Sequence, residues 1–328
     1  MKHNNVIQVN NLVKKFNGFE AVKGVSFNVR EGETFGFLGP NGAGKTTTIN
    51  MLVTIVRPTS GSATLNGFDV SSNPAQVRQS IGIVFQDPSL DERLTAMDNL
   101  QFHGLIYNVD KETRNKNIAN MLEMMKLSER KNDIVRTFSG GMKRRLEIAR
   151  GLIHEPKVLF LDEPTLGLDP QTRNYIWTYI SRLKERTGLT IFLTTHYMDE
   201  AENCDRIAII DNGEIIALDT PENLKKMVGE NIITLHTEDN NAAGSEIREK
   251  FSIEPQINNG EIRLEVKDGE HFIPRLIKET TTTIKSISLW KPTLEDVFLK
   301  LTGRAIREQK AGAADQMRQH AAMWGKRR

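Results

Sequence analysis

Residues 39–46 read Gly-Pro-Asn-Gly-Ala-Gly-Lys-Thr, and this stretch constrains the fold of the chain more than any other. It matches the phosphate-binding loop G-x-x-x-x-G-K-[ST], with a second threonine directly behind it. An apolar run at 34–38 precedes the loop, and a helix-compatible run at 46–53 follows it. A strand that turns tightly into a helix directs backbone N–H groups and the positive helix end at one point, which suits a triphosphate. We therefore predict a nucleotide site here and disfavour the alternative, an ordinary glycine-rich turn.

The chemistry of this motif assigns roles within the loop. Lys45 is expected to reach the β- and γ-phosphates, and the hydroxyl of Thr46 is expected to ligate Mg²⁺. The glycines let the backbone approach phosphate closely, and some of these positions require φ > 0. The predicted nucleotide-binding residues are Gly39, Pro40, Asn41, Gly42, Ala43, Gly44, Lys45, Thr46 and Thr47.

Length and composition set broader limits. A chain of 328 residues suggests about two domains. The net charge of +2 gives no electrostatic reason to expect nucleic acid as a partner. The single cysteine, Cys204, rules out an internal disulfide and is expected to be a small buried hydrophobe. The first residues are too polar for a signal peptide and the apolar runs are too short to cross a bilayer, so any membrane role is expected to work through a partner.

The hydrophobic pattern predicts an α/β core. Alternating residues before the loop indicate short antiparallel strands. Continuous apolar runs at 158–161, 189–193 and 207–210 are typical of strands buried on both faces of a parallel sheet. Residues 88–152 are mostly helical in pattern, and the methionine-rich cluster at 121–127 is expected to be the core face of a helix rather than a ligand-binding patch.

The predicted domains follow from a change of character near 221–229. The first is a nucleotide-binding domain at 1–225, with a helical subdomain at about 88–152. A small α+β domain follows at 226–304, with a hairpin signal at 258–260. The last residues, 305–328, are basic. We expect them to be a solvated helix, or alternatively a contact for anionic lipid headgroups or a partner.

A second anchor is the acidic pair at the end of the run at 158–161. An apolar strand that ends in Asp162 places this carboxylate at the edge of the sheet where ligands of open α/β sheets bind. Asp162 is expected to hold Mg²⁺, and Glu163 is expected to polarise the attacking water. The alternative, a strand that merely ends in an acidic turn, is disfavoured by the presence of Lys45 in the same chain.

A third anchor is Ser139-Gly140-Gly141, which opens a basic helical run. Ser139 suits the N-cap of a helix. Each glycine costs helix stability of about 1 kcal/mol, so this pair indicates that backbone N–H groups approach a ligand such as phosphate. One helix N-terminus of the chain is already expected to bind the phosphates of the nucleotide. A second helix N-terminus suited to phosphate therefore suggests a site shared between two subunits. A glycine-rich helix cap is the alternative.

The order of these motifs resembles the nucleotide-binding subunit of ATP-binding-cassette (ABC) transporters. The resemblance runs from the phosphate loop through Gln86, the segment 138–142, Asp162-Glu163 and His196, and it covers about residues 5–225. It implies a P-loop NTPase core with an antiparallel β subdomain and a helical subdomain, followed here by the small α+β domain. Phe138 and Met142 replace the commonest Leu and Gln of the family's signature sequence, as in its export branches.

The resemblance also implies roles for residues that the motifs alone do not assign. Phe16 stands where the family places an aromatic ring on adenine. Gln86 resembles the residue that touches Mg²⁺ or the attacking water and links to the membrane partner. His196 resembles the switch histidine at the γ-phosphate, and Leu168-Asp169 resembles the loop that crosses the dimer interface. The implied catalytic residues are Glu163, His196, Gln86 and Lys45, and the implied Mg²⁺ ligands are Thr46, Gln86 and Asp162.

The resemblance further implies the assembly and the reaction. Two copies would sandwich two ATP molecules, with Ser139, Gly140 and Gly141 of each copy completing the site of the other. Hydrolysis of ATP to ADP and phosphate would drive a separate membrane permease, with this chain on the cytoplasmic face of the membrane. Glu200 and Glu202, in the acidic stretch after His196, are expected to be structural.

The segment at about 285–304 indicates the branch of the family. It resembles the end of ATPases that serve drug exporters of the daunorubicin-resistance type, and it is expected to form a Pro-started helix that packs Leu294, Val297, Phe298 and Leu301. ATPases for sodium, polysaccharide or lipid transport are the alternative, as is an importer subunit. A soluble ABC protein acting on ribosomes or DNA is disfavoured by the single cassette. The cargo stays open, because its contacts would lie in the permease.

Overall fold

The computed structural model describes residues 4–258 and 261–303. These residues form two compact units that divide between Thr220 and Pro221, and the predicted boundary at residue 225 falls inside helix α8 (Pro221–Lys226). Residues 259–260 of the expected hairpin turn and the basic tail at 305–328 lie outside the described part. Within that part, no helix is both long and apolar enough to span a bilayer.

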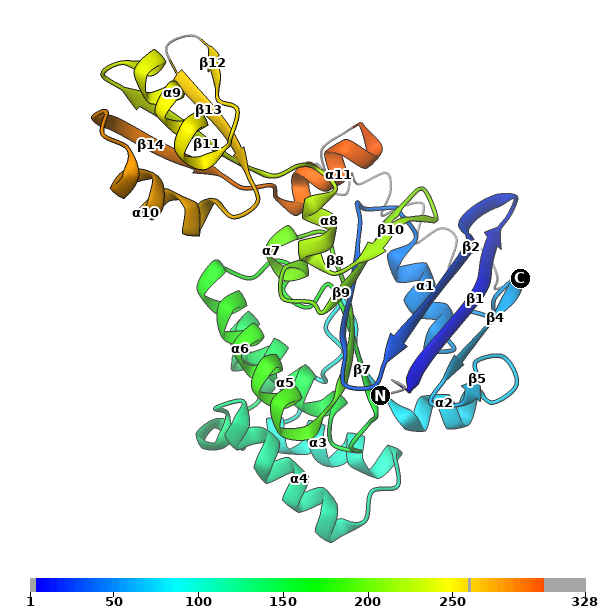
Figure 1. The fold of residues 1–328 in the computed structure, drawn as a ribbon. Coiled ribbons are helices and arrows are strands. Elements are labelled where there is room, and N and C mark those ends of the chain that lie inside the picture. Colours follow the sequence, from blue (N-terminus) through cyan, green and yellow to red (C-terminus); the bar gives the residue numbers. More distant parts are fainter. Residues whose placement is uncertain (1–3, 259–260, 304–328) are drawn as a thin grey trace. The chain divides into compact units, whose positions relative to one another are not determined.

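A six-stranded sheet forms the centre of the first unit (Figure 1). Its strands lie in the order β10-β9-β3-β8-β7-β6, and all but β10 run parallel. They are β3 (Thr34–Leu38), β6 (Ile81–Val84), β7 (Val158–Asp162), β8 (Thr190–Thr195), β9 (Arg206–Asp211) and β10 (Glu214–Asp219). Every residue of β3, β7 and β8 is buried. The parallel sheet predicted from continuous apolar runs is therefore confirmed.

A second, antiparallel sheet packs against the first through aromatic side chains. Its strands lie in the order β2-β1-β4-β5. The ring of Phe27 on β2 lies 5.4 Å from Phe35 on β3 and 5.9 Å from Phe192 on β8. These rings fill the space between the sheets and hold the strand that precedes the phosphate loop. The four strands are β1 (Asn5–Phe16), β2 (Phe19–Arg30), β4 (Ser60–Leu65) and β5 (Phe68–Asp69).

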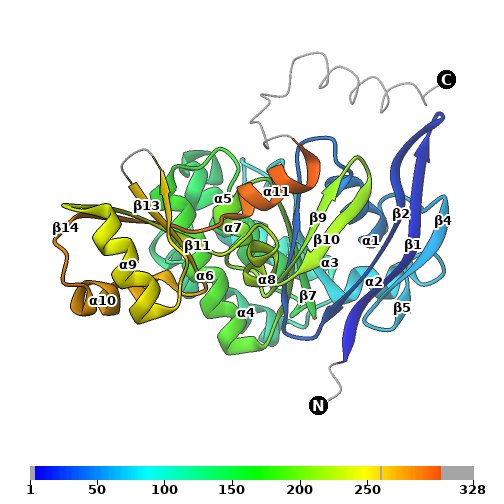
Figure 2. The same ribbon diagram turned by 45° about the horizontal axis from the view of Figure 1, so that its top comes forward.

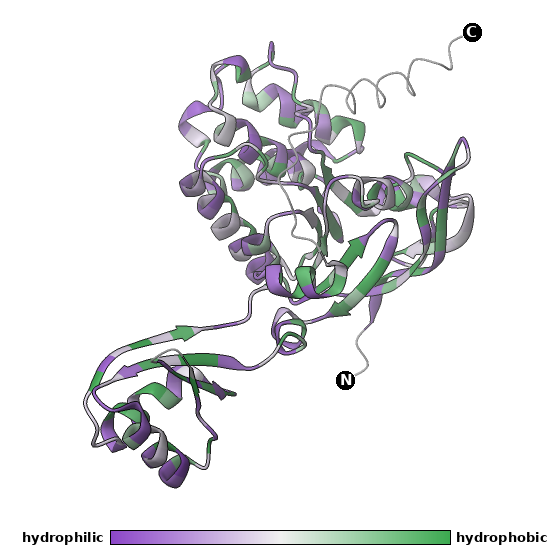
Figure 3. Ribbon diagram, turned by 90° about the horizontal axis from the view of Figure 1, so that it is seen from above, coloured by the Kyte–Doolittle hydropathy of each residue, from purple (hydrophilic) through white to green (hydrophobic). Residues whose placement is uncertain are grey.

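Helices cover both faces of the central sheet. Helix α1 lies on the side of the antiparallel sheet, and α5 and α6 lie on the other side (Figure 1). Apolar residues concentrate on the central strands, while the helices carry many hydrophilic residues (Figure 3). The helices are α1 (Lys45–Leu52), α2 (Pro74–Ser80), α3 (Ala96–Ile106), α4 (Lys111–Met124), α5 (Gly140–Gly151), α6 (Pro170–Thr187) and α7 (Met198–Ala201), with 3-10 turns at Ser128–Arg130 and Val135–Thr137.

The methionine-rich cluster at the end of α4 divides between core and surface. Leu122, Met125 and Leu127 are buried, as expected for a core face. Met121 and Met124 are only half-buried and line a cavity. The prediction of a core face is therefore wrong for these two side chains, because a single face of α4 packs on the helices beneath it.

The second unit is a four-stranded antiparallel sheet with two helices on one face (Figure 2). The strand order β12-β13-β11-β14 and the sequence of elements form a split βαβ arrangement. Alternate residues of β11 and β13, such as Ile233 and Leu264, are buried against α9 and α10. The elements are β11 (Asn231–Thr237), α9 (Asn240–Phe251), β12 (Gln256–Asn258), β13 (Glu261–Val266), α10 (Gly269–Glu279), β14 (Ile284–Trp290) and α11 (Leu294–Thr302).

Helix α11 begins at Leu294, two residues later than a helix that starts at Pro292. Thr293 is the N-cap and forms a reciprocal capping box with Asp296, so Pro292 precedes the cap. Leu294, Val297 and Phe298 are buried as expected. Elsewhere, Cys204 is also buried as expected, and burial raises the pKa of its thiol.

A half-buried histidine on α3, His103, predicts how the stability of the first unit depends on pH. Burial, and secondarily the charge of Arg150, lowers the pKa of His103 to about 3, whereas an unfolded histidine titrates near 6.5. Below pH 6.5 the unfolded chain therefore binds a proton that the folded chain rejects. The free energy of unfolding should fall as the pH decreases toward 3, by at most about 1.4 kcal/mol per pH unit from this group.

Urea unfolding of the wild type and of His103→Gln at pH 7.5 and pH 5 checks this expectation. The variant should lose less stability than the wild type between the two pH values. Equal losses would show that His103 does not carry the effect. The ring of His154 lies 5.8 Å from that of His103, and burial also lowers the pKa of His154, so the variant should flatten the dependence only in part.

Candidate active site

The predicted site residues meet where three parallel strands end. Leu38 on β3 pairs with Thr195 on β8, and Asp162 on β7 pairs with Thr194 on β8. The phosphate loop, the acidic pair and His196 therefore all leave the sheet at its carboxyl edge. This is the edge at which open α/β sheets bind their ligands.

The phosphate loop is wrapped around the ammonium group of Lys45. The Nζ atom donates to the carbonyl of Gly39 at 2.8 Å and to that of Pro40 at 3.1 Å, and the side chain is 4% exposed. Burial lowers the pKa of Lys45, and the nearby charge of Glu163 opposes this shift. Helix α1 begins directly at Lys45, so its N-terminus points into the loop.

Two glycines of the loop are required by contacts within the chain itself. A Cβ atom on Gly39 would lie 2.2 Å from the carbonyl oxygen of Ile210. Gly44 has φ +102°, and a Cβ there would lie 2.7 Å from the carbonyl oxygen of Ala21. The sequence explained these glycines by the approach of phosphate and by positive φ, which Gly44 has, and packing against β9 and β2 adds a further reason.

Asp162 is held among hydroxyl groups. It is 2% exposed, its Oδ1 accepts from the hydroxyl of Thr194, and Thr46 Oγ1 lies 3.4 Å from the same oxygen. Burial raises the pKa of Asp162, and the hydrogen bond from Thr194 works against this shift. A carboxylate and a hydroxyl side by side are hard oxygen donors of the kind that Mg²⁺ prefers, so the residues present fit this ion.

The carboxylate of Glu163 contacts both Lys45 of the phosphate loop and His196. Its Oε1 lies 3.4 Å from Nζ of Lys45 and 3.2 Å from Nδ1 of His196. Burial alone would raise the pKa of this carboxyl, but the contacts with His196 and Lys45 outweigh burial and lower it. The backbone has φ 45° and is held there by a hydrogen bond from its N–H to the carbonyl of Thr194 at 3.1 Å. The ionised carboxylate is thus fixed between two basic groups.

The remaining residues implied by the resemblance lie at more open positions. Gln86 is exposed and follows β6, whose Val84 pairs with Leu161, so Gln86 lies near the level of Glu163. The ring of Phe16 is 45% exposed, and Nζ of Lys14 lies 4.8 Å from its centroid. An exposed ring is available for stacking on a base.

The signature segment forms the exposed N-terminus of α5. Ser139 is the N-cap and accepts from the N–H of Met142 at 3.3 Å. Ser139 and Gly140 are exposed. A Cβ atom on Gly141 would lie 2.6 Å from Cγ2 of Thr172 on α6, whereas one on Gly140 would meet only Leu168 at an ordinary 3.7 Å. The start of α6, capped by its own Asp169, therefore packs beside the signature glycines.

Two residues next to this site were not singled out by the sequence. Arg144 and Glu147 lie on α5 behind the signature segment and are buried as an ion pair. Their spacing of three residues on a helix was the available signal, but the sequence shows these residues only as part of a basic helical run. Glu200, predicted to be structural, is 1% exposed and accepts from the hydroxyl of Thr165.

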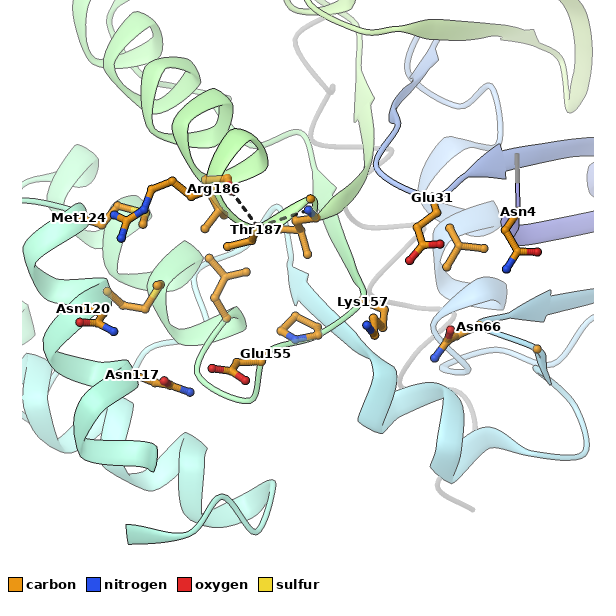
Figure 4. A pocket seen from close by; sticks show the side chains of 18 of the residues that line it. Asn4, Glu31, Asn66, Asn117, Asn120, Met124, Glu155, Lys157, Arg186 and Thr187 are labelled. Atoms are coloured by element: carbon orange, nitrogen blue, oxygen red, sulfur yellow. Dashed lines mark hydrogen bonds between the residues drawn. The ribbon is translucent and has the colours of Figure 1, made fainter. Parts of the chain in front are cut away.

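The cavity in Figure 4 lies away from these residues. It has a volume of about 860 Å³ and includes Lys157 and Leu189, which precede β7 and β8. It therefore opens at the amino edge of the sheet, opposite to the predicted nucleotide site. Asparagine side chains such as Asn117 and Asn120 surround it (Figure 4).

Comparison with known proteins agrees with this geometry. Residues 22–166 match the family described as ABC transporter, and residues 220–302 match the C-terminal domain of ATP-binding proteins like DrrA1-3. The linearmycin resistance ATP-binding protein LnrL of Bacillus subtilis (strain 168) is 40% identical over 92% of this chain and 100% of its own. The daunorubicin/doxorubicin resistance ATP-binding protein DrrA of Streptomyces peucetius is 38% identical over 90% and 92% of the two chains.

The solved structures agree as well. One of them is described as the dimeric post-hydrolysis state of the ATP-binding cassette MJ0796 bound to ADP and Pi. It is 29% identical, has a TM-score of 0.59, and covers 65% of this chain and 98% of its own. The α/β fold with a P-loop NTPase core is therefore confirmed. This chain belongs to the ABC transporter family as one of its ATP-binding, ATP-hydrolysing proteins.

Proposed function

We propose that this chain works as one half of an ATP-driven dimer that powers export of a drug-like small molecule through a separate membrane permease. The observation that carries the proposal is the meeting of Lys45, Asp162, Glu163 and His196 at one edge of the sheet. Relatives along nearly the whole chain are named as drug-resistance ATP-binding proteins. The second unit matches the C-terminal domain of the same branch.

The proposed roles follow from position and charge. Lys45 and the backbone N–H groups of the phosphate loop bind the phosphates of ATP, and the exposed ring of Phe16 stacks on adenine. Glu163 accepts a proton from the attacking water, and His196 is close enough to contact both this carboxylate and the γ-phosphate. Lys45 contacts Glu163 in the structure, so ATP binding would draw Lys45 toward phosphate and free the carboxylate for water.

Thr46, Asp162 and Gln86 are the proposed residues for Mg²⁺. When bound, this ion neutralises charge on the phosphate oxygens during transfer. Asp162 supplies a carboxylate held in place by Thr194, and Thr46 supplies a hydroxyl on the first turn of α1. Gln86 is exposed, so its side chain can contact a partner protein and couple nucleotide binding to that protein.

The proposed dimer is supported by the exposed signature segment. Ser139 and Gly140 present a helix N-terminus to the outside, whereas Lys45 and Glu163 are buried. A phosphate bound by another copy could reach this helix end without any change in the fold. The solved cassette MJ0796, similar in fold, is described as dimeric.

The function is tested by purification from a membrane extract. The chain should hydrolyse ATP and should co-purify with an integral membrane protein. It would then lie on the cytoplasmic face of the membrane that contains this protein. Co-purification with ribosomes would favour a soluble ABC protein instead. If the chain and its permease, reconstituted together, transported sodium, polysaccharide or lipid, the ATPase function would stand and only the proposed cargo would be wrong.

Gly140→Ala separates the fold from the shared site. A Cβ at this position meets Leu168 at 3.7 Å and lies in the first turn of α5, so the thermal midpoint should stay the same or rise slightly. The added methyl group would stand between the helix N-terminus and a phosphate, so ATPase turnover should fall at least about ten-fold. Calorimetry and phosphate release measure the two effects. Unchanged turnover would argue that Gly140 does not approach nucleotide.

A further inference from the structure

A buried ion pair on α5 connects the signature helix to the catalytic residues of the same chain. Arg144 is 7% exposed and Glu147 is 1% exposed. The Nη1 atom of Arg144 donates to Oε2 of Glu147 at 3.0 Å, one turn farther along the helix. Desolvation makes such a pair costly, so partners beyond the pair itself must stabilise it.

The guanidinium group of Arg144 binds the backbone around the catalytic carboxylate. Its Nη2 donates to the carbonyls of Asp162 and Glu163, each at 3.2 Å, and its Nε donates to that of Pro164 at 2.5 Å. Three successive carbonyls are thus held by one rigid, planar group. This is the segment in which Glu163 adopts the left-handed conformation, with φ 45°.

The same pair also holds the segment around Gln86. Nη1 of Arg144 donates to the carbonyl of Phe85 at 2.6 Å, directly before Gln86. Oε1 of Glu147 accepts from the N–H of Ser89 at 2.7 Å. Both ends of the short segment that carries Gln86 are therefore tied to α5.

We infer that Arg144 and Glu147 are positioning residues for ATP hydrolysis, which fix Glu163 and Gln86 relative to the signature helix. The inference rests on the proposed function, since Glu163 and Gln86 have their roles there. Neither residue of the pair is assigned a contact with nucleotide. The pair acts through five backbone groups, and a misplacement of about 1 Å at a catalytic group can cost about 100-fold in rate.

Arg144→Lys in the full-length chain tests this role. Lysine keeps the charge, but its donors all lie on one nitrogen atom. It therefore cannot span the carbonyls of Phe85 and of residues 162–164 as the planar guanidinium group does. We expect kcat to fall at least about ten-fold, while KM for ATP stays within about two-fold because the phosphate loop is untouched.

Arg114→Lys is the matched control. Arg114 on α4 also donates to a carbonyl, that of Val109 at 2.9 Å, and to Gln101 at 2.7 Å, but neither hydrogen bond reaches β7 or the Gln86 segment. Its replacement removes the same kind of hydrogen bond and should leave kcat within about two-fold of the wild type.

A double variant separates positioning from mere stabilisation. Arg144→Met combined with Glu147→Leu removes both charges together, so it leaves no unpaired buried charge, and it remains informative if Arg144→Lys fails to fold. It should bind a fluorescent ATP analogue like the wild type and still show the loss in kcat. Wild-type kcat in either folded variant, or an equal loss in Arg114→Lys, would overturn the inference. A wild-type chain without ATPase activity would instead contradict the proposed function.

Discussion

Glu163→Gln is expected to lower ATP turnover by at least about 100-fold, because the variant loses the only proposed acceptor for the proton of the attacking water. The amide has nearly the shape of the carboxylate, so the fold should be retained. Binding of ATP should be retained too, since Glu163 contacts Lys45 rather than the backbone N–H groups of the loop. Removing the negative charge should even favour ATP, because Lys45 no longer has a competing carboxylate at 3.4 Å.

The same variant should accumulate as an ATP-bound dimer. Phosphate release gives the turnover, and size-exclusion chromatography with and without ATP gives the oligomeric state. Glu185→Gln, on the exposed side of α6, is the control with the same chemical change and should behave as the wild type. Wild-type turnover in Glu163→Gln would remove Glu163 from its proposed role, and a monomer in ATP would count against the ATP-bound dimer.

Ser139→Arg is expected to abolish turnover without weakening ATP binding by the isolated chain. Ser139 is exposed at the N-terminus of α5, so the longer side chain has room in the monomer. In the proposed dimer it would occupy the place of the partner's phosphates. The loss of the N-cap should cost only about 1 kcal/mol of stability, which is too little to unfold the chain. An equal loss of binding and turnover would argue against a shared site.

Mixing two inactive variants gives the sharper form of this test. Ser139→Arg keeps Lys45, and Lys45→Ala keeps Ser139, so a mixed dimer contains one site built from two intact halves. The mixture should recover part of the wild-type turnover, whereas each variant alone should have almost none. A site confined to one chain would recover nothing on mixing, because every chain in the mixture carries one lesion.

The local motifs could be predicted from the sequence because each depends on residues close together in the chain. The phosphate loop between β3 and α1 needs glycines at fixed intervals. Ser139 could be predicted at the start of α5 because serine is a favoured N-cap residue. Continuous apolar runs predicted β7 and β8, because strands that are buried on both faces of a sheet carry apolar residues on both sides. The roles of Gln86 and His196 came only from resemblance, since a lone glutamine or histidine carries no pattern.

The tertiary structure decided what depends on contacts between distant segments. Gly39 must be glycine because the carbonyl of Ile210, far along the chain, lies against it. The pKa of Glu163 is lowered because His196, after β8, and Lys45, at the start of α1, converge on it. In the sequence Arg144 is one residue of a basic helical run, yet in the structure it is buried because it meets carbonyls from β7 and from the segment after β6. Sequence periodicity reports which face of an element is apolar, but a buried charge is recognised only when the fold brings its partners to it.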